Sequence, residues 1–273
     1  MSEVVRKYYN REVDWEWERL GTPYRRLEMA STLRLIDEHF PRTGRIADVG
    51  GGPGRYTIEL LRRGYRVTLV DLAEGNVEFA RAQLDALGLE AEGVMSADAR
   101  DLSSLGTESF DAALLLGPMY HLVAEDDRRA ALLELRRILR PGAPAVVGFV
   151  NPWGVLRALL AEMPEMYADE DHVRRLLSTC VQIGEQEAFT EAAFLTPPQA
   201  LAELRAAGFA VDARAGVEGF AAGMEAEVKK MAAEDPAGYA NVVRLVAETC
   251  DMPAFQDSTE HLHVIVRRLD PSP

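Results

Sequence analysis

The chain has 273 residues, 48% of them hydrophobic, so it can bury one large core or one core with a smaller helical attachment. Its 44 acidic and 30 basic side chains give a formal charge of −14, which repels phosphate backbones, so we expect no nucleic-acid partner. With two isolated cysteines, no signal peptide and no membrane-length apolar run, we expect a cytoplasmic protein without disulfides, zinc or a membrane partner.

Residues 1 to about 43 show the three-and-four spacing of apolar side chains that predicts helices, and Gly21-Thr22-Pro23 divides them into two. From residue 45 the pattern changes to strands that alternate with helices. The predicted strands cover 45–49, 66–71, 90–95, 110–116 and 145–150, and the predicted helices cover 54–63, 74–87 and 125–139. Such alternation predicts a parallel sheet with right-handed crossovers.

After residue 150 the regular alternation ends. Residues 155–190 predict two or three helices with a loose join at 185–190, and they are followed by a helix at 197–208 and a strand at 209–217. Two further helices, separated near Asp235-Pro236, precede a last strand at 261–268. We therefore predict a helical lid at 1–43 and one domain at 44–273, with helical insertions at about 151–195 and 218–257.

A glycine-rich turn, Gly50-Gly51-Gly52-Pro53-Gly54, separates the first predicted strand from the helix after it. Glycines bring bare backbone amides close to a ligand, and the following helix points its N-terminal amides into the same crevice. Asp71 ends the second strand, where a carboxylate can accept hydrogen bonds from both ribose hydroxyls of an adenosine group, or can cap the next helix. A dinucleotide motif would need glycine at position 55, which is Arg55, so a nicotinamide cofactor is disfavoured.

The spacing Asp48-x-Gly50-x-Gly52-x-Gly54 resembles the first motif of class I S-adenosylmethionine-dependent methyltransferases. Residues 67–71, 96–99 and 110–116 resemble the second, third and fourth motifs, and residues 135–142 resemble the helix exit before the fifth strand. The resemblance is close over about 40–150 and looser over 197–217 and the last strand. It implies an α/β fold with a Rossmann-like, seven-stranded, mostly parallel sheet and an antiparallel last strand.

The resemblance also implies S-adenosyl-L-methionine as the cofactor. Asp48 and the glycine turn would approach its methionine moiety, Asp71 would hold the ribose, and Asp98 with the Ala99 amide would read the adenine edge. Aromatic and cationic residues of the N-terminal helices would cover the methionine carboxylate, although the aromatic ones could simply pack on the sheet. The full set of expected cofactor contacts is Tyr9, Arg25, Asp48, Gly50, Gly51, Gly52, Gly54, Asp71, Leu72, Asp98, Ala99 and Leu116.

The methyl acceptor would face the end of the fourth strand, Gly117-Pro118-Met119-Tyr120-His121-Leu122. This segment departs from the Asn/Asp-Pro-Pro-Tyr/Phe motif associated with the amines of nucleic-acid bases and with glutamine amides. A neutral His121 could take a proton from a phenol, carboxylic acid or amine, or could only structure the pocket. Tyr120 could be a pocket wall or could favour a sulfonium through cation–π contact. His261 and His263 share a strand face but lack an acidic partner in the sequence, so we expect no metal.

The sequence thus predicts an enzyme that moves a methyl group to oxygen or nitrogen, less readily carbon, of a small metabolite. Two alternatives remain at this point: a non-methylating reaction such as cyclisation on the same fold, and a non-catalytic cofactor-binding module. The acceptor, the attacking atom and the oligomeric state, a homodimer included, stay open.

Overall fold

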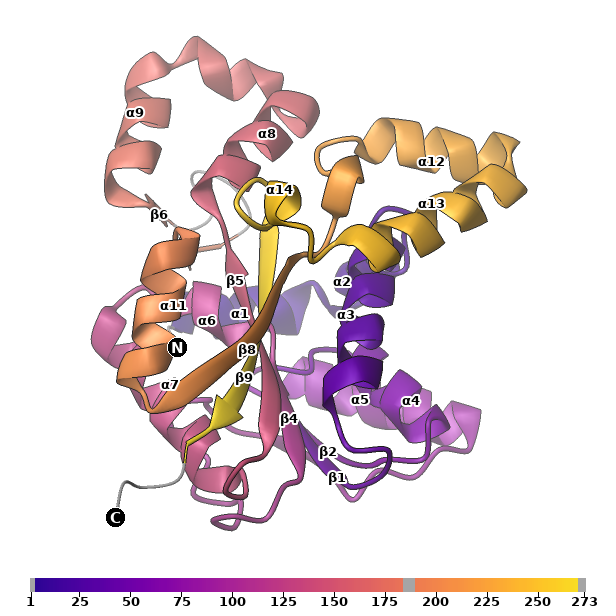
Figure 1. Cartoon of the computed structure of the whole chain (residues 1–273), viewed down its shortest axis with the longest axis vertical. Coiled ribbons are helices and arrows are strands. Elements are labelled where there is room, and N and C mark those ends of the chain that lie inside the picture. Colours follow the sequence, from indigo (N-terminus) through magenta and orange to yellow (C-terminus); the bar gives the residue numbers. More distant parts are fainter. Residues whose placement is uncertain (1–2, 184–189, 270–273) are drawn as a thin grey trace.

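A seven-stranded sheet runs through the centre of the protein in a computed structural model that describes residues 3–183 and 190–269 (Figure 1). Its order is β3-β2-β1-β4-β5-β9-β8. The strands are β1 (Arg45–Val49), β2 (Arg66–Asp71), β3 (Gly93–Ser96), β4 (Ala112–Leu115), β5 (Pro144–Val150), β8 (Phe209–Gly216) and β9 (His261–Arg268). β9 runs antiparallel to both of its neighbours, β5 and β8. The structure therefore confirms the Rossmann-like sheet with an antiparallel last strand.

Helices cover both faces of this sheet. They are α1 (Glu3–Arg11), α2 (Val13–Leu20), α3 (Arg25–His39), α4 (Arg55–Arg62), α5 (Glu74–Leu87), α6 (Pro118–His121), α7 (Glu125–Ile138), α8 (Pro152–Glu162), α9 (Glu170–Thr179), α11 (Pro197–Ala206), α12 (Glu225–Glu234), α13 (Pro236–Thr249) and α14 (Pro253–Gln256). Two short 3₁₀ helices, η1 (Pro164–Ala168) and η2 (Gly219–Ala221), lie in the insertions. The described helices include none long and apolar enough to cross a membrane.

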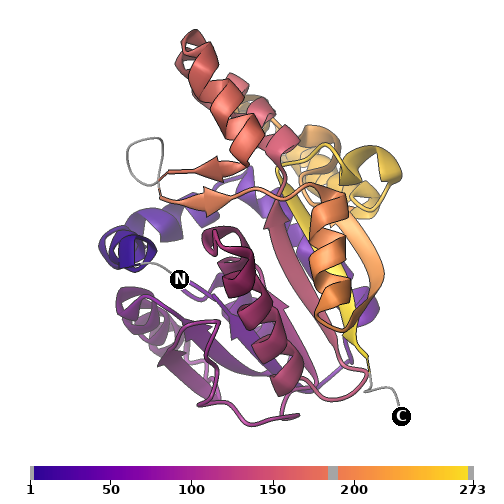
Figure 2. The same cartoon turned by 90° about the vertical axis from the view of Figure 1, so that its left-hand side faces the viewer.

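Successive strand residues face opposite layers, because side chains alternate along a strand. Ile46 and Leu114 pack in a cluster that includes residues of α3 and α4. Ala47 and Leu115 pack with residues of α7 and α11, which cover the sheet face turned toward the viewer in Figure 2. Both faces of these two central strands are therefore covered, and only Arg45 at the start of β1 is partly exposed.

Two short segments differ from the sequence prediction. The N-terminal segment forms three helices instead of two, because the chain also leaves the helical path at Glu12, where φ is −104° and ψ is 23°. The insertion at 151–195 contains a small antiparallel pair, β6 (Val181–Gln182) and β7 (Ala192–Ala193), in addition to helices. The loose join predicted at 185–190 falls almost wholly outside the described residues. The helix break at Asp235-Pro236 is confirmed, and the Asp235 side chain caps α13 by accepting from the Gly238 amide.

The carboxyl ends of the parallel strands meet at one edge of the sheet, where folds of this type bind ligands. Because β9 is antiparallel, its first residue lies at this same edge, where His261 pairs with Val150 at the end of β5. The α8–α9 segment projects beyond this edge in both views (Figures 1 and 2). The N-terminal helices, both insertions and the first residue of β9 thus contribute side chains to the cavities at this edge.

A buried ion pair fixes the end of α6, which carries Tyr120 and His121. Arg128 of α7 binds both carboxylate oxygens of Glu203 on α11, at 2.6 and 2.9 Å. Its Nη1 donates to the carbonyl oxygens of Leu122 and Val123, just beyond α6. The position of α6 is therefore set by two helices that pack on the sheet.

Candidate active site

The loop between β1 and α4 can adopt its path only with glycine at its first position. Gly50 has φ of +74°, and a Cβ placed on it would lie 2.3 Å from Cδ of Pro118. The amides of Gly50 and Gly51 both donate to the carbonyl oxygen of Val70, at 2.7 and 3.2 Å. The loop is thereby clamped between the end of β2 and the start of α6.

Asp71 ties this loop to the start of α5. Its carboxylate accepts from the backbone amide of Gly52 at 2.8 Å, the amide of Ala73 at 2.9 Å and the side-chain amide of Asn76 at 3.1 Å. Burial raises the pKa of Asp71, although these three donors favour its ionised form. Asp71 therefore does act as a cap at the start of α5, because it accepts from the Ala73 amide. The same carboxylate also holds the glycine loop through the Gly52 amide.

Asp48 lies beside the loop, at the end of β1. Its carboxylate accepts from the hydroxyl of Thr57 on α4, at 2.7 Å, and is almost fully buried. Burial raises the pKa of Asp48 to about 6, against the effect of the Thr57 hydrogen bond. A nearby cation would favour the ionised form of this group.

The loop, α1, α2 and α6 surround a first cavity. Eight of the predicted cofactor contacts line it: Tyr9, Asp48, Gly50, Gly51, Gly52, Asp71, Leu72 and Leu116. A glycine backbone without side chains, carboxylates and tyrosine rings in one cavity match the needs of a ligand that carries ribose hydroxyls and a sulfonium cation. An added Cβ on Gly52 would meet no atom within 4 Å, so the backbone is open to a ligand at this point.

Four predicted contacts lie outside the lining of this cavity. Gly54 packs toward Ala80 of α5, and Ala99 is buried in the core beneath the sheet edge. Asp98 pairs with Arg100 at 2.7 Å, and this contact lowers the pKa of Asp98 to about 2 although burial opposes it. Arg25 lines a different cavity, 3.7 Å from Glu260. The first cavity thus brings together most of the predicted methionine and ribose contacts, and the predicted adenine contacts, Gly54 and Arg25 lie outside it.

The N-terminal helices close over the first cavity through contacts with three parts of the domain. The Tyr9 hydroxyl lies 2.8 Å from Nε2 of His121, and the Asn10 side chain accepts from the Gly75 amide at 2.8 Å. Arg55, which occupies the position of a dinucleotide-motif glycine, stacks on the Trp17 ring with its guanidinium 3.7 Å from the ring centroid. The aromatic residues of this segment therefore both pack and line the cavity.

Residues 46–142 match the model of a family described as "Methyltransferase domain". The chain carries a class I S-adenosylmethionine-dependent methyltransferase domain. The cofactor of this methyltransferase domain is S-adenosyl-L-methionine, and the residues of the first cavity fit it.

The methyltransferase domain has relatives of named activity. The tRNA 5-carboxymethoxyuridine methyltransferase of Escherichia coli K12 is 31% identical over 126 residues, which cover 45% of this chain and 46% of that protein. The ubiquinone biosynthesis O-methyltransferase of Maricaulis maris is 28% identical over 162 residues, 55% of this chain and 61% of that protein. The chain thus spans about half the length of the curated relatives it matches first.

Among solved structures, the 1,6-didemethyltoxoflavin-N1-methyltransferase of Burkholderia thailandensis superposes with a TM-score of 0.59. The superposition covers 98% of this chain and 88% of that one at 17% identity, which supports the fold.

A second cavity of about 750 Å³ adjoins the first. Its walls come from α1, α2, α8, α12, the β6–β7 pair and the start of β9. Five residues line both cavities: Tyr9, Glu16, Arg19, Tyr120 and His261. The two cavities therefore meet at these side chains.

Both ring nitrogens of His121 are engaged by the protein. Nδ1 lies 3.1 Å from the carbonyl oxygen of Glu191, which can only accept, so Nδ1 carries the proton. Nε2 then accepts from the hydroxyl of Tyr9. Burial lowers the pKa of His121 to about 4, so the ring is neutral at pH 7. His121 lines only the first cavity and orients Tyr9 toward the junction.

The neutral state of His121 predicts an acid-sensitive fold. The folded-state pKa of about 4 lies below the ordinary 6.5, so its stabilising contribution is complete above pH 6.5 and is lost as the pH falls toward 4. Between pH 7 and 5, this group should remove about 2 kcal/mol from the free energy of unfolding. Urea unfolding of wild type and His121→Asn at both pH values measures it: the variant should lose less stability on acidification. Equal losses would contradict a neutral, buried His121.

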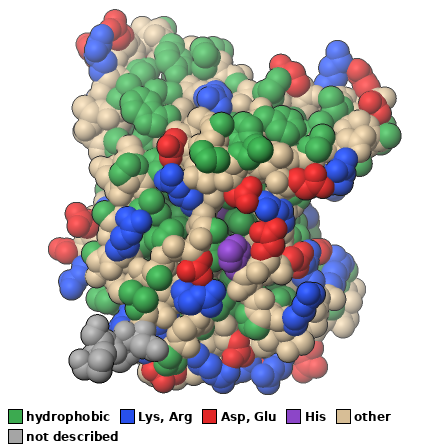
Figure 3. All heavy atoms as spheres, in the orientation of Figure 1, with side chains coloured by type: hydrophobic (Ala, Val, Ile, Leu, Met, Phe, Trp, Pro, Cys, Tyr) green, Lys and Arg blue, Asp and Glu red, His purple; other side chains and the backbone are tan. Residues whose placement is uncertain are grey.

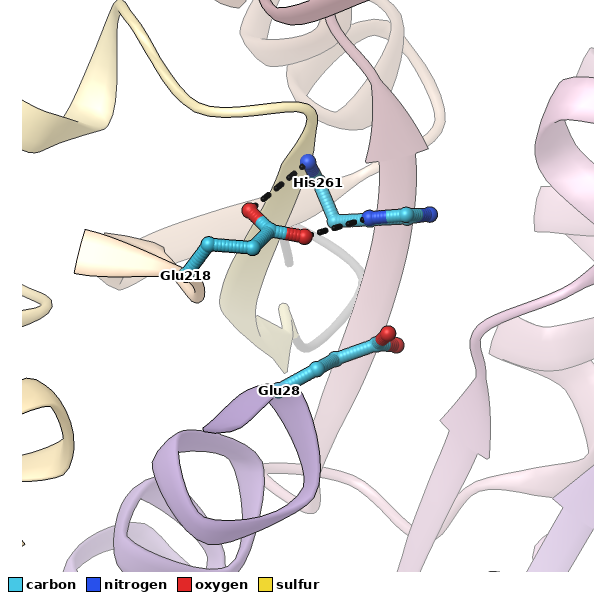
Figure 4. A group of neighbouring side chains, drawn as sticks. All are labelled: Glu28, Glu218 and His261. Atoms are coloured by element: carbon cyan, nitrogen blue, oxygen red, sulfur yellow. Dashed lines mark hydrogen bonds and ion pairs between the residues drawn. The ribbon is translucent and has the colours of Figure 1, made fainter. Parts of the chain in front are cut away.

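Sequence reasoning missed two features of the junction. Arg19 holds Glu16 through two hydrogen bonds of 2.7 Å within α2, a pair that the i,i+3 spacing could have suggested. His261 meets two glutamates from other parts of the chain, Glu28 of α3 and Glu218 before η2 (Figure 4). The expectation that His261 lacks an acidic partner is therefore wrong, and no local pattern could reveal these glutamates.

Proposed function

We propose that this chain transfers the methyl group of S-adenosylmethionine to oxygen or nitrogen of a small molecule held in the second cavity. The observation that carries the proposal is the meeting of the two cavities at five shared side chains. A methyl group at that junction would face a chamber of about 750 Å³, within the range of about 300–1,000 Å³ of small-molecule sites. Tyr8, Trp15 and Phe194 give the chamber an aromatic lining that suits a flat or apolar acceptor.

A small acceptor fits the charge of the protein better than a nucleic acid does. The formal charge is −14, and Lys and Arg side chains lie interspersed with Asp and Glu on the face shown in Figure 3. The second cavity itself holds glutamates from several elements, among them Glu162, Glu225 and Glu260. Because the name of one relative includes tRNA, the substrate panel that tests this proposal should include tRNA beside the small molecules.

The cofactor supplies an electrophilic methyl group on a sulfonium. The chain's own residues hold that methyl and its acceptor in line and exclude water from the junction. In this proposal Asp71 binds the ribose, Asp48 and the glycine loop contact the methionine end, and Arg19 takes the role that the sequence suggested for Arg25. Tyr120 forms a neutral aromatic wall, since burial raises its pKa, and His121 acts through Tyr9. The segments at 1–43, 151–195 and 218–257 act as the lid.

Calorimetry and product analysis test the proposal. We expect S-adenosylmethionine and S-adenosylhomocysteine to bind, and one class in a panel of phenols, amines, carboxylic acids and tRNA to yield methylated product with S-adenosylhomocysteine. Methylation of tRNA alone would overturn the small-molecule acceptor. Release of methylthioadenosine would indicate cyclisation, and binding without turnover across the panel would indicate a non-catalytic module.

A further inference from the structure

His261 lies at the edge of the sheet where the parallel strands end, because β9 runs in the opposite direction. It is the first residue of an antiparallel strand, and it pairs with the last residue of β5, Val150. Its side chain lines both cavities. A nitrogen of this imidazole ring can therefore reach an acceptor bound where the two cavities meet.

Glu218 fixes the orientation of this ring. Its Oε1 lies 2.6 Å from Nδ1 of His261, and its Oε2 accepts from the His261 backbone amide at 3.2 Å. Only 1% of Glu218 is exposed, so its carboxylate is shielded from water. An ionised carboxylate only accepts, so Nδ1 carries the proton and Nε2 is the nitrogen turned away from Glu218 (Figure 4).

The geometry also distinguishes a proton site from a metal site. Glu28, Glu218 and His261 place ligand atoms within 4.8 Å of one another. Two ligand atoms of a tetrahedral zinc ion, each about 2.0 Å from the metal, lie roughly 3.3 Å apart. The 2.6 Å contact between Nδ1 and Oε1 is shorter and is that of a charge-assisted hydrogen bond.

We propose that His261, oriented by Glu218, is the base that removes the proton from the acceptor, and that the acceptor bears a weakly acidic hydroxyl such as a phenol. The inference rests on the proposed function. As the acceptor oxygen forms its bond to the methyl carbon, the carbon–sulfur bond breaks and its electron pair stays on sulfur. The O–H bond breaks and the proton moves to Nε2 of His261. The positive charge thus passes from the sulfonium to the imidazolium, and the total charge is unchanged.

The groups around the ring determine its starting protonation state. Burial lowers the pKa of His261, but Glu28, Glu218 and Glu260 outweigh it and raise the pKa to about 9. The charged or titratable groups around this region also include Glu16, Arg19, Arg25, Tyr9, Tyr120, Glu162, Glu225, Lys229 and His263. A sulfonium bound in the first cavity would repel the imidazolium and lower its pKa toward neutrality. Binding of the cationic cofactor would thereby increase the fraction of His261 that is neutral and can accept a proton.

Side-chain NMR titration of the full-length protein tests this coupling without turnover. With S-adenosylhomocysteine bound, the His261 signal, assigned with His261→Gln, should titrate near pH 9. With S-adenosylmethionine bound, its pKa should be lower by about one or more, and Glu218→Gln should lower it in either complex. The same pKa in both complexes, or no effect of Glu218→Gln, would overturn the proposal.

Kinetics with phenols of graded acidity test the base role directly. His261→Gln should slow methylation of an ordinary phenol by about 10²–10⁴-fold, and should slow a nitrophenol, which ionises without help, far less. His39→Gln, at the end of α3, serves as the matched control with wild-type rates. An equal loss of methylation rate for both phenols would show that His261 has a structural role and is not the base. A wild-type protein that methylates nothing would instead contradict the proposed function, whatever the titration shows.

Discussion

Gly50→Ala is expected to destabilise the domain by about 2–5 kcal/mol, whereas Gly52→Ala is expected to lose cofactor affinity and keep most of its stability. Both glycines have positive φ, +74° and +55°. A Cβ at Gly50 would collide with the Pro118 ring at 2.3 Å, so the loop or α6 must move. A Cβ at Gly52 would meet no protein atom within 4 Å and would project from the wall of the first cavity. Its cost to folding is the left-handed backbone alone, about 1–2 kcal/mol.

Thermal unfolding and calorimetric titration with S-adenosylhomocysteine separate these two effects. Gly52→Ala should bind at least about tenfold more weakly, the equivalent of about 1.4 kcal/mol. Gly88→Ala is the matched control, because Gly88 has φ of +63°, has no neighbour within 4 Å of an added Cβ and ends α5 away from the cavity. It should match Gly52→Ala in stability and the wild type in affinity. Wild-type affinity in Gly52→Ala would show that the cofactor does not approach this amide.

Asp71→Ala is expected to lower both stability and cofactor affinity. The substitution leaves three donors without their acceptor in a buried setting: the amides of Gly52 and Ala73 and the side chain of Asn76. We expect a loss of about 2–4 kcal/mol in the free energy of unfolding and about a hundredfold loss in affinity, on the scale of charge-assisted hydrogen bonds. Asp101→Ala is the control, since Asp101 is an exposed turn acid that accepts from the Ser103 amide. A folded Asp71→Ala protein with wild-type affinity would remove the ribose assignment.

The sequence predicted the first two strands and the loop between β1 and α4 because the signals for them are local. The strands at 45–49 and 66–71 and the glycine loop between β1 and α4 lie within one continuous stretch, and the structure has both strands at those limits. Short, mainly apolar stretches bounded by turn signals are typical of buried parallel strands, and left-handed turns favour glycine. The break at Glu12 carried no such signal, because neither glycine nor proline marks it.

The residues around the second cavity could not be predicted in the same way. Glu28, Glu218 and His261 meet only because α3, the second insertion and an antiparallel strand converge on one edge. Arg25 was expected at the methionine carboxylate, yet the turn of α3 directs it to Glu260 and the second cavity. Such placements depend on tertiary packing, which spacing along the chain does not encode.

The residues that line the two cavities come from different parts of the chain. The stretch that matches the family model, residues 46–142, holds the β1–α4 loop and Asp71, and of the residues that line the second cavity it supplies Tyr120. The other lining residues of that cavity come from segments before or after this stretch. Under the proposed function, a change in the flanking segments would alter the acceptor cavity and leave the β1–α4 loop and Asp71 in place. For the same reason, similarity to a relative over the central stretch alone is evidence about the cofactor. It is not evidence that the relative and this chain methylate the same molecule.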